Sequence, residues 1–194
     1  MTAEAAGPEI PPEASPCPSV LVVMGVSGSG KTTIASLLAR RLDWIFEDAD
    51  WFHPPANVEK MAAGTPLTDE DRWPWLAAIA AWIDETRTGG RHGIVACSAL
   101  RRAYRAALVR QHGDAVRIVY LEGDRALIGQ RMALRQGHFM PQALLDSQFD
   151  ALEAPGPDER PLTVSVEPHP NKVVDAIVAA LEAEIGGPVP KNRS

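Results

Sequence analysis

The sequence has 194 residues, of which 45% are hydrophobic and 23% charged, as is ordinary for a folded globular protein. Its formal net charge of -6 argues against general nucleic-acid binding, and no uninterrupted apolar stretch approaches the ~18 residues of a membrane span. The only cysteines, Cys17 and Cys97, predict no disulfide framework, which favours a reducing cytoplasm.

The two ends of the chain differ in composition from the middle. Residues 1–18 are rich in proline and glutamate and offer too little apolar surface to offset the entropy of ordering. We therefore predict a flexible leader over 1–18, a single domain over 19–186 and a flexible tail over 187–194. An arm that binds a partner is the alternative interpretation of the leader.

A phosphate-binding loop is the strongest motif. The apolar run at 20–24 predicts a buried strand, and the apolar spacing from Ile34 to Leu42 predicts one face of a helix. The stretch between them matches G-x-x-x-x-G-K-[ST] in the strand–loop–helix context that this motif requires. Its glycines let the main chain approach a phosphate, and the helix N-terminus adds unpaired N–H groups. The predicted ATP-binding residues are Gly25, Val26, Ser27, Gly28, Ser29, Gly30, Lys31, Thr32 and Thr33.

Two of these residues have individual predicted roles. Lys31 is expected to reach the β and γ phosphates as a mobile charge, and the Thr32 hydroxyl to ligate Mg²⁺. The alternative is an ordinary glycine-rich turn before a helix, but four fixed positions in the right context rarely coincide.

A pair of carboxylates follows the second predicted strand, residues 44–47. Ligands of open parallel sheets bind beyond the carboxyl ends of strands, and alternation places Asp48 and Asp50 on the same side of an extended segment. We predict that one of the two carboxylates holds Mg²⁺ through water and that the other binds a substrate hydroxyl. A solvated turn with helix-capping acids is the alternative.

Residues 51–92 are predicted to form the acceptor-binding region. A short helix around 56–63 is followed by a longer one after the acidic run at 69–71, which suits a helix start. Arg72 lies near that start, where an anionic substrate would need its fork of donors. Trp75 and Trp82 recur at helical spacing and are predicted to be core residues.

Two groups of arginines are candidates for holding anions. Arg101 and Arg105 share a helical face after the third predicted strand, 93–97, although a solvated basic face is the alternative. Arg131 and Arg135 end a helix after the fourth strand, 116–121, and lead into a glycine-containing break. We predict that residues 131–141 form a lid that closes cations over transferring phosphate. Surface arginines beside an ordinary helix break are the alternative.

The whole pattern predicts an α/β fold. A fifth strand at 162–166 and a last helix after Pro170 complete an alternation of strands and helices. Right-handed crossovers between parallel strands then give a three-layer structure with a five-stranded parallel sheet and a mobile lid.

Several further motifs, taken together, resemble the gluconate kinase family over about residues 20–182. The likeness begins with the phosphate loop, Asp48-Ala49-Asp50 and Phe52-His53-Pro54, followed by Asn57, Glu59, Lys60 and Met61. It continues through Leu67-Thr68-Asp69-Glu70-Asp71-Arg72, Pro74-Trp75-Leu76, Cys97-Ser98-Ala99-Leu100-Arg101, Tyr104-Arg105, Gly137-His138-Phe139 and Ser147-Gln148-Phe149.

The resemblance implies a P-loop NTPase of the nucleoside-monophosphate-kinase type that phosphorylates D-gluconate at its 6-hydroxyl with ATP, commonly as a homodimer. Two departures stand out: Ala49 replaces the family's usual glycine, and Arg101 stands where lysine is common, which changes the donor geometry. No nucleic-acid or membrane partner is expected.

The resulting role assignments keep their alternatives. Asp50 is expected to orient or deprotonate the attacking hydroxyl, with His53 as the other candidate base or a packing residue. A shikimate-type or nucleotide kinase would keep the loop and change the acceptor, whereas a nucleotide-dependent switch or binding module would bind ATP without acceptor-stimulated turnover. The predicted metal residues are Thr32 and Asp48. The predicted catalytic residues are Lys31, Asp50, Arg131 and Arg135, and the predicted substrate-binding residues are Asp50, His53, Arg72, Arg101 and Arg105.

Overall fold

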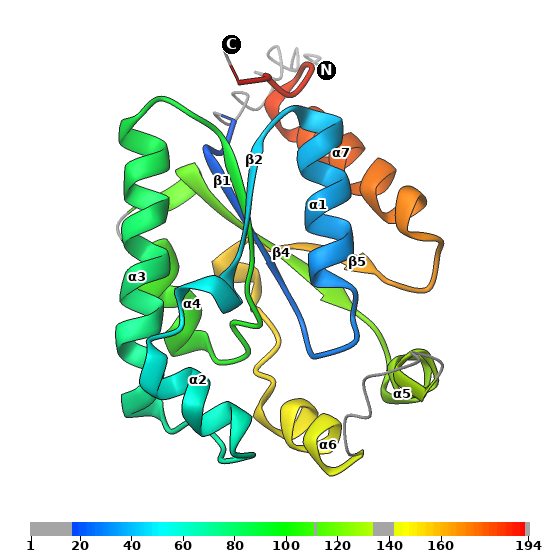
Figure 1. The fold of residues 1–194 in the computed structure, drawn as a ribbon. Helices are drawn as coiled ribbons and strands as arrows, with labels where there is room; N and C mark the ends of the chain where they lie inside the picture. The colour runs from blue at the N-terminus through cyan, green and yellow to red at the C-terminus, as the bar shows by residue number, and fades with distance from the viewer. Residues whose placement is uncertain (1–16, 111, 134–141, 193–194) are drawn as a thin grey trace, which may run out of the picture.

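A parallel sheet forms the centre of the molecule, which is described by a computed structural model over residues 17–110, 112–133 and 142–192. All neighbouring strands pair in parallel, and helices cover both faces (Figure 1). The predicted five-stranded α/β architecture is therefore confirmed. The strand order is β2-β3-β1-β4-β5, with bounds β1 (Val20–Met24), β2 (Ile45–Asp48), β3 (Gly93–Ala96), β4 (Val116–Glu122) and β5 (Leu162–Ser165).

The long helices form the outer layers. One face of the sheet carries α1 (Lys31–Leu42) and α7 (Pro170–Ile185), and the other carries α3 (Asp69–Thr88) and α4 (Arg102–Val109) (Figure 1). The shorter helices α2 (Pro55–Ala62), α5 (Arg125–Ala133) and α6 (Gln142–Ala151) lie beyond the carboxyl ends of the strands. Three 3₁₀ turns are η1 (Ala49–Phe52), η2 (Gly113–Ala115) and η3 (Pro157–Glu159).

The central strand separates two hydrophobic cores. Leu21 and Val23 of β1 pack into the core under α1 and α7, whereas Val20, Val22 and Met24 pack into the core under α3 and α4. All five side chains are fully buried, because successive residues of a strand point to opposite faces and both faces are covered by helices. The connection after β1 runs to one edge of the sheet and that after β3 crosses to the other, which places a binding crevice at these carboxyl ends.

The C-terminal segment differs from the predicted flexible tail. The carbonyl of Pro190 accepts a hydrogen bond from Nε1 of the buried Trp44 at 2.7 Å. Asn192 accepts from the main-chain N–H of His92 at 2.6 Å and donates to its carbonyl at 2.9 Å, and the rings of Trp44 and His92 stack. Residues 187–192 are thus tied to the domain, because a buried indole N–H needs an acceptor. Residues 1–16 and 193–194 lie outside the described residues, so the predicted leader is not tested.

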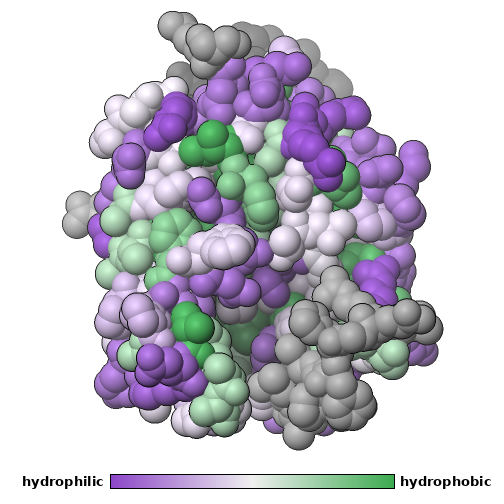
Figure 2. Space-filling model, viewed as in Figure 1, coloured by the Kyte–Doolittle hydropathy of each residue, from purple (hydrophilic) through white to green (hydrophobic). Residues whose placement is uncertain are grey.

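Hydrophobic and hydrophilic side chains are mixed on the surface that carries α2 (Figure 2). The large exposed hydrophobic residues of the described chain gather in the predicted acceptor region: Trp51, Val58, Met61 and Trp73. No helix within the described ranges combines the length and apolar character needed to cross a bilayer.

Candidate active site

The phosphate-binding loop lies between β1 and α1, with backbone angles that its glycines permit. Gly28 and Gly30 have φ of 80° and 95°, in the left-handed region that favours glycine. A Cβ on Gly28 would come within 2.6 Å of Cγ of Met132, so a side chain there would force the Met132 side chain to move. Gly30 precedes the first residue of α1, and the open N-terminus of this helix therefore faces the loop. This cradle fits a polyphosphate.

The predicted metal residues are adjacent in the structure. The Thr32 hydroxyl donates to Oδ2 of Asp48 at 2.8 Å, and Nζ of Lys31 donates to the carbonyl of Val26 at 3.2 Å. A hydroxyl and a carboxylate beside a phosphate cradle fit Mg²⁺, which keeps several waters and takes few protein ligands. Consistent with this, no cluster of three or more His, Cys, Asp or Glu side chains suited to a metal occurs in the described parts of the chain.

Asp50 does not follow Asp48 in an extended segment, contrary to the prediction from alternation. β2 ends at Asp48, and residues 49–52 form the turn η1, in which Oδ1 of Asp48 accepts from the N–H of Asp50 at 3.1 Å. Asp48 is therefore a cap of this turn as well as a neighbour of Thr32. The tight turn brings Asp50 back over the edge of the sheet with an exposed side chain.

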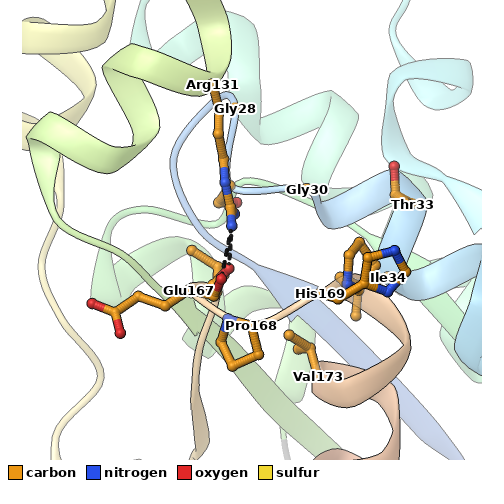
Figure 3. Close-up of a pocket in the computed structure, with 12 residues that line it drawn as sticks. Gly28, Gly30, Thr33, Ile34, Arg131, Glu167, Pro168, His169 and Val173 are labelled. Atoms are coloured by element: carbon orange, nitrogen blue, oxygen red, sulfur yellow. Dashed lines mark hydrogen bonds between the residues drawn. The ribbon is translucent and has the colours of Figure 1, made fainter.

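A large cavity of about 370 Å³ lies beside the phosphate loop. One wall consists of Gly28, Gly30 and Ile34, and the opposite wall runs from Val166, just after β5, to Val173 in the first turn of α7. Figure 3 shows Arg131 reaching from α5 toward this segment, where its Nη2 donates to the carbonyl of Val166 at 2.6 Å. The sequence did not predict that residues 166–173 line a binding cavity. Their place after the last strand of a parallel sheet is the signal that could have found them.

His53 and Trp75 form the floor of the acceptor region. Their rings stack at 4.5 Å with 6° between the planes, and Nε1 of Trp75 donates to the carbonyl of Ala49 at 2.7 Å. Trp75 is buried as predicted and also fixes the turn that carries Asp50. Partial burial lowers the pKa of His53, and Arg72 lowers it further, although Asp50 opposes the shift. His53 is accordingly a neutral imidazole at pH 7.

Two predicted arginines converge on a carboxylate that the sequence analysis did not single out. Nη1 of Arg101 donates to Oδ2 of Asp69 at 2.6 Å, and Nη1 of Arg72 donates to Oδ1 at 3.3 Å. The Tyr104 hydroxyl donates to the same Oδ1 at 2.5 Å. Both guanidinium carbons lie 5.8 Å from the Tyr104 ring centroid, within cation–π range. The Tyr104 hydrogen bond, joined by the two arginine charges, lowers the pKa of Asp69.

This cluster borders a cavity of about 100 Å³. Its arginines are each half-exposed, and Asp69 engages only one nitrogen of each guanidinium. The cluster also touches the phosphate loop indirectly, because the carbonyl of Ser98, another lining residue, accepts from the N–H of Gly25 at 3.4 Å. The cavity can therefore receive an anion close to the phosphate site. Its lining residues are Arg72, Trp75, Ser98, Leu100, Arg101, Tyr104 and Ala151.

Arg105 does not join the predicted substrate site. Its side chain is 1% exposed, and Glu159 accepts from Nε at 2.6 Å and from Nη2 at 2.9 Å. Nη1 donates to the carbonyls of Ala99 and Leu100, both at 3.2 Å. Four of the five N–H groups of this guanidinium are engaged in the interior, where they support the loop after β3. Arg105 is therefore left out of the site.

The predicted lid, 131–141, is described only at its start, residues 131–133. Arg131 lies at the cavity, but Arg135 and the rest of 134–141 lie outside the described residues. After this segment, α6 returns to the phosphate loop, where the Ser27 N–H donates to Oε1 of Gln148 at 2.6 Å. Gln148 belongs to the Ser147-Gln148-Phe149 motif, but the sequence predicts no role for it, because its local sequence does not show which residue it contacts.

The strand order, the glycine-lined cradle and the adjacent arginine-lined cavity together define a P-loop small-molecule kinase. A sequence profile described as an AAA domain matches residues 20–155. A gluconokinase from Gluconobacter oxydans is 47% identical over 169 residues, which cover 86% of this chain and 93% of the relative. The chain belongs to the gluconokinase family.

Solved structures give the same result. A gluconokinase from Sinorhizobium meliloti is 41% identical with a TM-score of 0.76, and the match covers 86% of this chain and 93% of that chain. A sugar kinase from Janibacter sp. is 42% identical with a TM-score of 0.79, covering 90% and 99%. The expected family and fold are thereby confirmed.

Proposed function

We propose that this chain transfers the γ-phosphoryl group of ATP to the 6-hydroxyl of D-gluconate, giving 6-phospho-D-gluconate and ADP. The observation that carries the proposal is the pairing of a phosphate cradle with a doubly arginine-lined cavity at one edge of the sheet. Family membership adds the reaction, since relatives at 40–47% identity are named gluconokinase.

The loop N–H groups and Lys31 would hold the phosphates of ATP, and the base would occupy the larger cavity between the loop and the 166–173 segment. Thr32 and Asp48 would bind Mg²⁺, which supplies charge neutralisation to the phosphates when bound. The support is the 2.8 Å contact between these two oxygen groups next to the cradle.

D-Gluconate offers one carboxylate and a row of hydroxyls. Arg72 and Arg101 would bind the carboxylate with the nitrogens that Asp69 does not use, while Asp50 and the neutral His53 would accept from hydroxyls. The carboxylate would then lie in the small cavity, and the far hydroxyl would lie toward Asp50 and the phosphate loop.

Phosphoryl transfer asks mostly for positioning and charge stabilisation from the protein. The 6-hydroxyl oxygen would form a bond to the γ phosphorus as the bond to the β–γ bridging oxygen breaks. Its proton would pass to the carboxylate of Asp50 and from there to solvent, and ADP would leave. Arg131 would release the carbonyl of Val166 and, with Arg135, stabilise the transferred charge, as the closing residues 131–141 exclude water.

Three wider assignments belong to the same proposal. Residues 19–186 would act as one catalytic domain with 51–92 as its acceptor-binding region, two copies would form a homodimer, and the protein would work in the cytoplasm. The domain bounds and the compartment are expectations from composition and sequence pattern, and the homodimer is an expectation from the family resemblance. Gel filtration of the purified chain measures the oligomeric state directly.

An acceptor panel tests the proposed reaction. ADP release from Mg-ATP would be measured with gluconate, shikimate, a nucleoside monophosphate or no acceptor, with NMR of the product to locate the phosphate. We expect stimulation by gluconate alone and loss of turnover by orders of magnitude in Lys31→Ala, with Lys191→Ala, an exposed lysine outside the proposed site, as the matched control. Equal ADP release with and without gluconate would contradict the proposal.

A further inference from the structure

A side chain from outside the phosphate loop accepts a hydrogen bond from a main-chain N–H of that loop. The Ser27 N–H donates to Oε1 of Gln148 at 2.6 Å, across 121 residues of sequence. Both residues are half-buried, and Gln148 lies in the second half of α6. A helix that follows the predicted lid therefore places an amide at the rim of the phosphate cradle.

The chemistry of this contact orients the amide. A main-chain N–H can only donate, so Oε1 must face Ser27, and the two hydrogens on Nε2 must point away from it. Among the described residues, the hydrogen bond to Ser27 is the one that the Gln148 side chain makes. The hydrogen bond to Ser27 thus orients the Nε2 donor of Gln148 beside the main-chain N–H groups that would surround the phosphates of a bound nucleotide.

The far end of α6 is fixed at the acceptor cavity. The N–H of Glu153 donates to the carbonyl of Leu100 at 2.9 Å, and the Glu153 carboxylate accepts from the N–H of Arg102 at 2.6 Å. Ala151 and Leu100 line the small cavity beside Arg72 and Arg101. On the other side of α6, Arg125 pairs with Asp146 and lies over the Phe149 ring. These contacts place Gln148 between the phosphate cradle and the acceptor cavity.

We infer that Gln148 is a catalytic residue that donates a hydrogen bond from Nε2 to the terminal phosphoryl group of ATP while Oε1 stays on the Ser27 N–H. The inference rests on the proposed function for its substrate, since the meeting point of the two sites is where the phosphoryl group would be transferred. A donor fixed in advance at that point stabilises developing charge without a reorganisation cost. Gln148 would thereby distinguish ATP from ADP.

A purely structural role makes the opposite prediction for one variant. Gln148→Glu keeps the shape of the side chain and an oxygen acceptor for the Ser27 N–H, but it replaces the NH₂ donor by a second, negatively charged oxygen. If Gln148 only steadies the loop, the hydrogen bond to Ser27 is kept, because a charge-assisted hydrogen bond is at least as strong, and the repulsion by the new charge falls on ATP and ADP alike. If Nε2 binds the terminal phosphoryl group, the new charge repels it. Gln130→Glu adds the same charge on an exposed face of α5 and is the matched control.

The experiment measures kcat and the gluconate KM together with calorimetric Kd values for ATP and ADP in the parent, Gln148→Glu, Gln148→Ala and Gln130→Glu. We expect kcat to fall about 10²–10³-fold in Gln148→Glu, as for loss of other transition-state donors, with an unchanged gluconate KM and melting temperature. The preference for ATP over ADP should fall about tenfold, and Gln148→Ala should show a smaller loss.

Gln148→Glu with the parent's kcat and ratio of ATP to ADP affinity would overturn the inference. The two proposals can fail separately. A parent chain that ignores gluconate contradicts the proposed reaction, whereas the ratio of nucleotide affinities tests Gln148 without any acceptor. If Gln148→Glu lowers the melting temperature, the ratio of ATP to ADP affinity in Gln148→Ala tests the inference instead, and a ratio equal to the parent's would overturn it.

Discussion

The Thr32 hydroxyl donates to Oδ2 of Asp48 at 2.8 Å, joining the first turn of α1 to the last residue of β2. Residues 16 apart in sequence are thus in contact at the edge of the sheet where the phosphate loop opens. Asp48 makes a second contact through its other oxygen, which caps η1. One carboxylate therefore couples the proposed metal site to the turn that carries Asp50.

Removing the charge of Asp48 should weaken the response to Mg²⁺. We expect Asp48→Asn to raise the Mg²⁺ concentration for half-maximal activity about tenfold, because an amide is a poorer ligand for a hard cation while it can still cap η1. A Mg²⁺ titration at fixed ATP checks this, with Glu47→Gln as the neighbouring control. Parental Mg²⁺ dependence in Asp48→Asn would remove Asp48 from the metal site.

Two arginines should separate binding from stability. Arg72→Ala should raise the gluconate KM with little change in melting temperature, since Arg72 is partly exposed at the small cavity. Arg105→Ala should instead destabilise the fold by about 3 kcal/mol or more, because it leaves the Glu159 carboxylate without its buried partner. Urea unfolding and steady-state kinetics on both variants measure the difference. A raised KM in a stable Arg105→Ala protein would return Arg105 to the substrate site.

Asp69 should act by positioning the two arginines of the small cavity. Asp69→Asn keeps the side-chain shape, but its amide cannot accept from Arg101 and Tyr104 at both oxygen positions. We expect the gluconate KM to rise about tenfold with kcat largely retained. The exposed Glu70→Gln on the same helix turn is the control. A fall in KM would mean that Asp69 competes with the substrate carboxylate.

The lowered pKa of His53 predicts a specific pH dependence of stability. Below its ordinary pKa near 6.5 the unfolded chain binds a proton at this imidazole more readily than the folded chain does. Stability should therefore be unaffected by His53 above that pH and should decline as pH falls below it. His53→Phe keeps a ring on Trp75 and cannot titrate, so its unfolding midpoint in urea should decline less between pH 7 and pH 5. Identical declines in both proteins would show that His53 is not the group responsible.

The elements and the phosphate loop were predictable because their signals are local. Lys31 and Thr32 belong to a contiguous motif, and the alternation of apolar runs with amphipathic segments identified each strand and the helices that link them. The burial of both faces of β1 follows from its uninterrupted apolar sequence, without knowledge of the residues that pack against it.

The environment of individual polar side chains was not predictable in the same way. Arg101 and Arg105 look equivalent in sequence, four residues apart on one helical face, yet Arg101 borders the small cavity beside Arg72 and Arg105 is buried against Glu159. The difference arises from Glu159, 54 residues later, which the fold places against α4. Asp69 likewise looks in sequence like an acidic residue of the first turn of a helix. Only the fold, which brings Tyr104 and Arg101 to it, shows that its carboxylate accepts hydrogen bonds from both.

The docking of residues 187–192 has a practical consequence for handling the protein. Pro190 and Asn192 are hydrogen-bonded to Trp44 and His92, and Trp44 immediately precedes β2, the strand that ends at Asp48. An affinity tag, a surface tether or a fluorescent fusion attached at the carboxyl end would thus pull on the strand that carries a proposed magnesium ligand. The indole of Trp44 would register such a disturbance as a change in intrinsic emission.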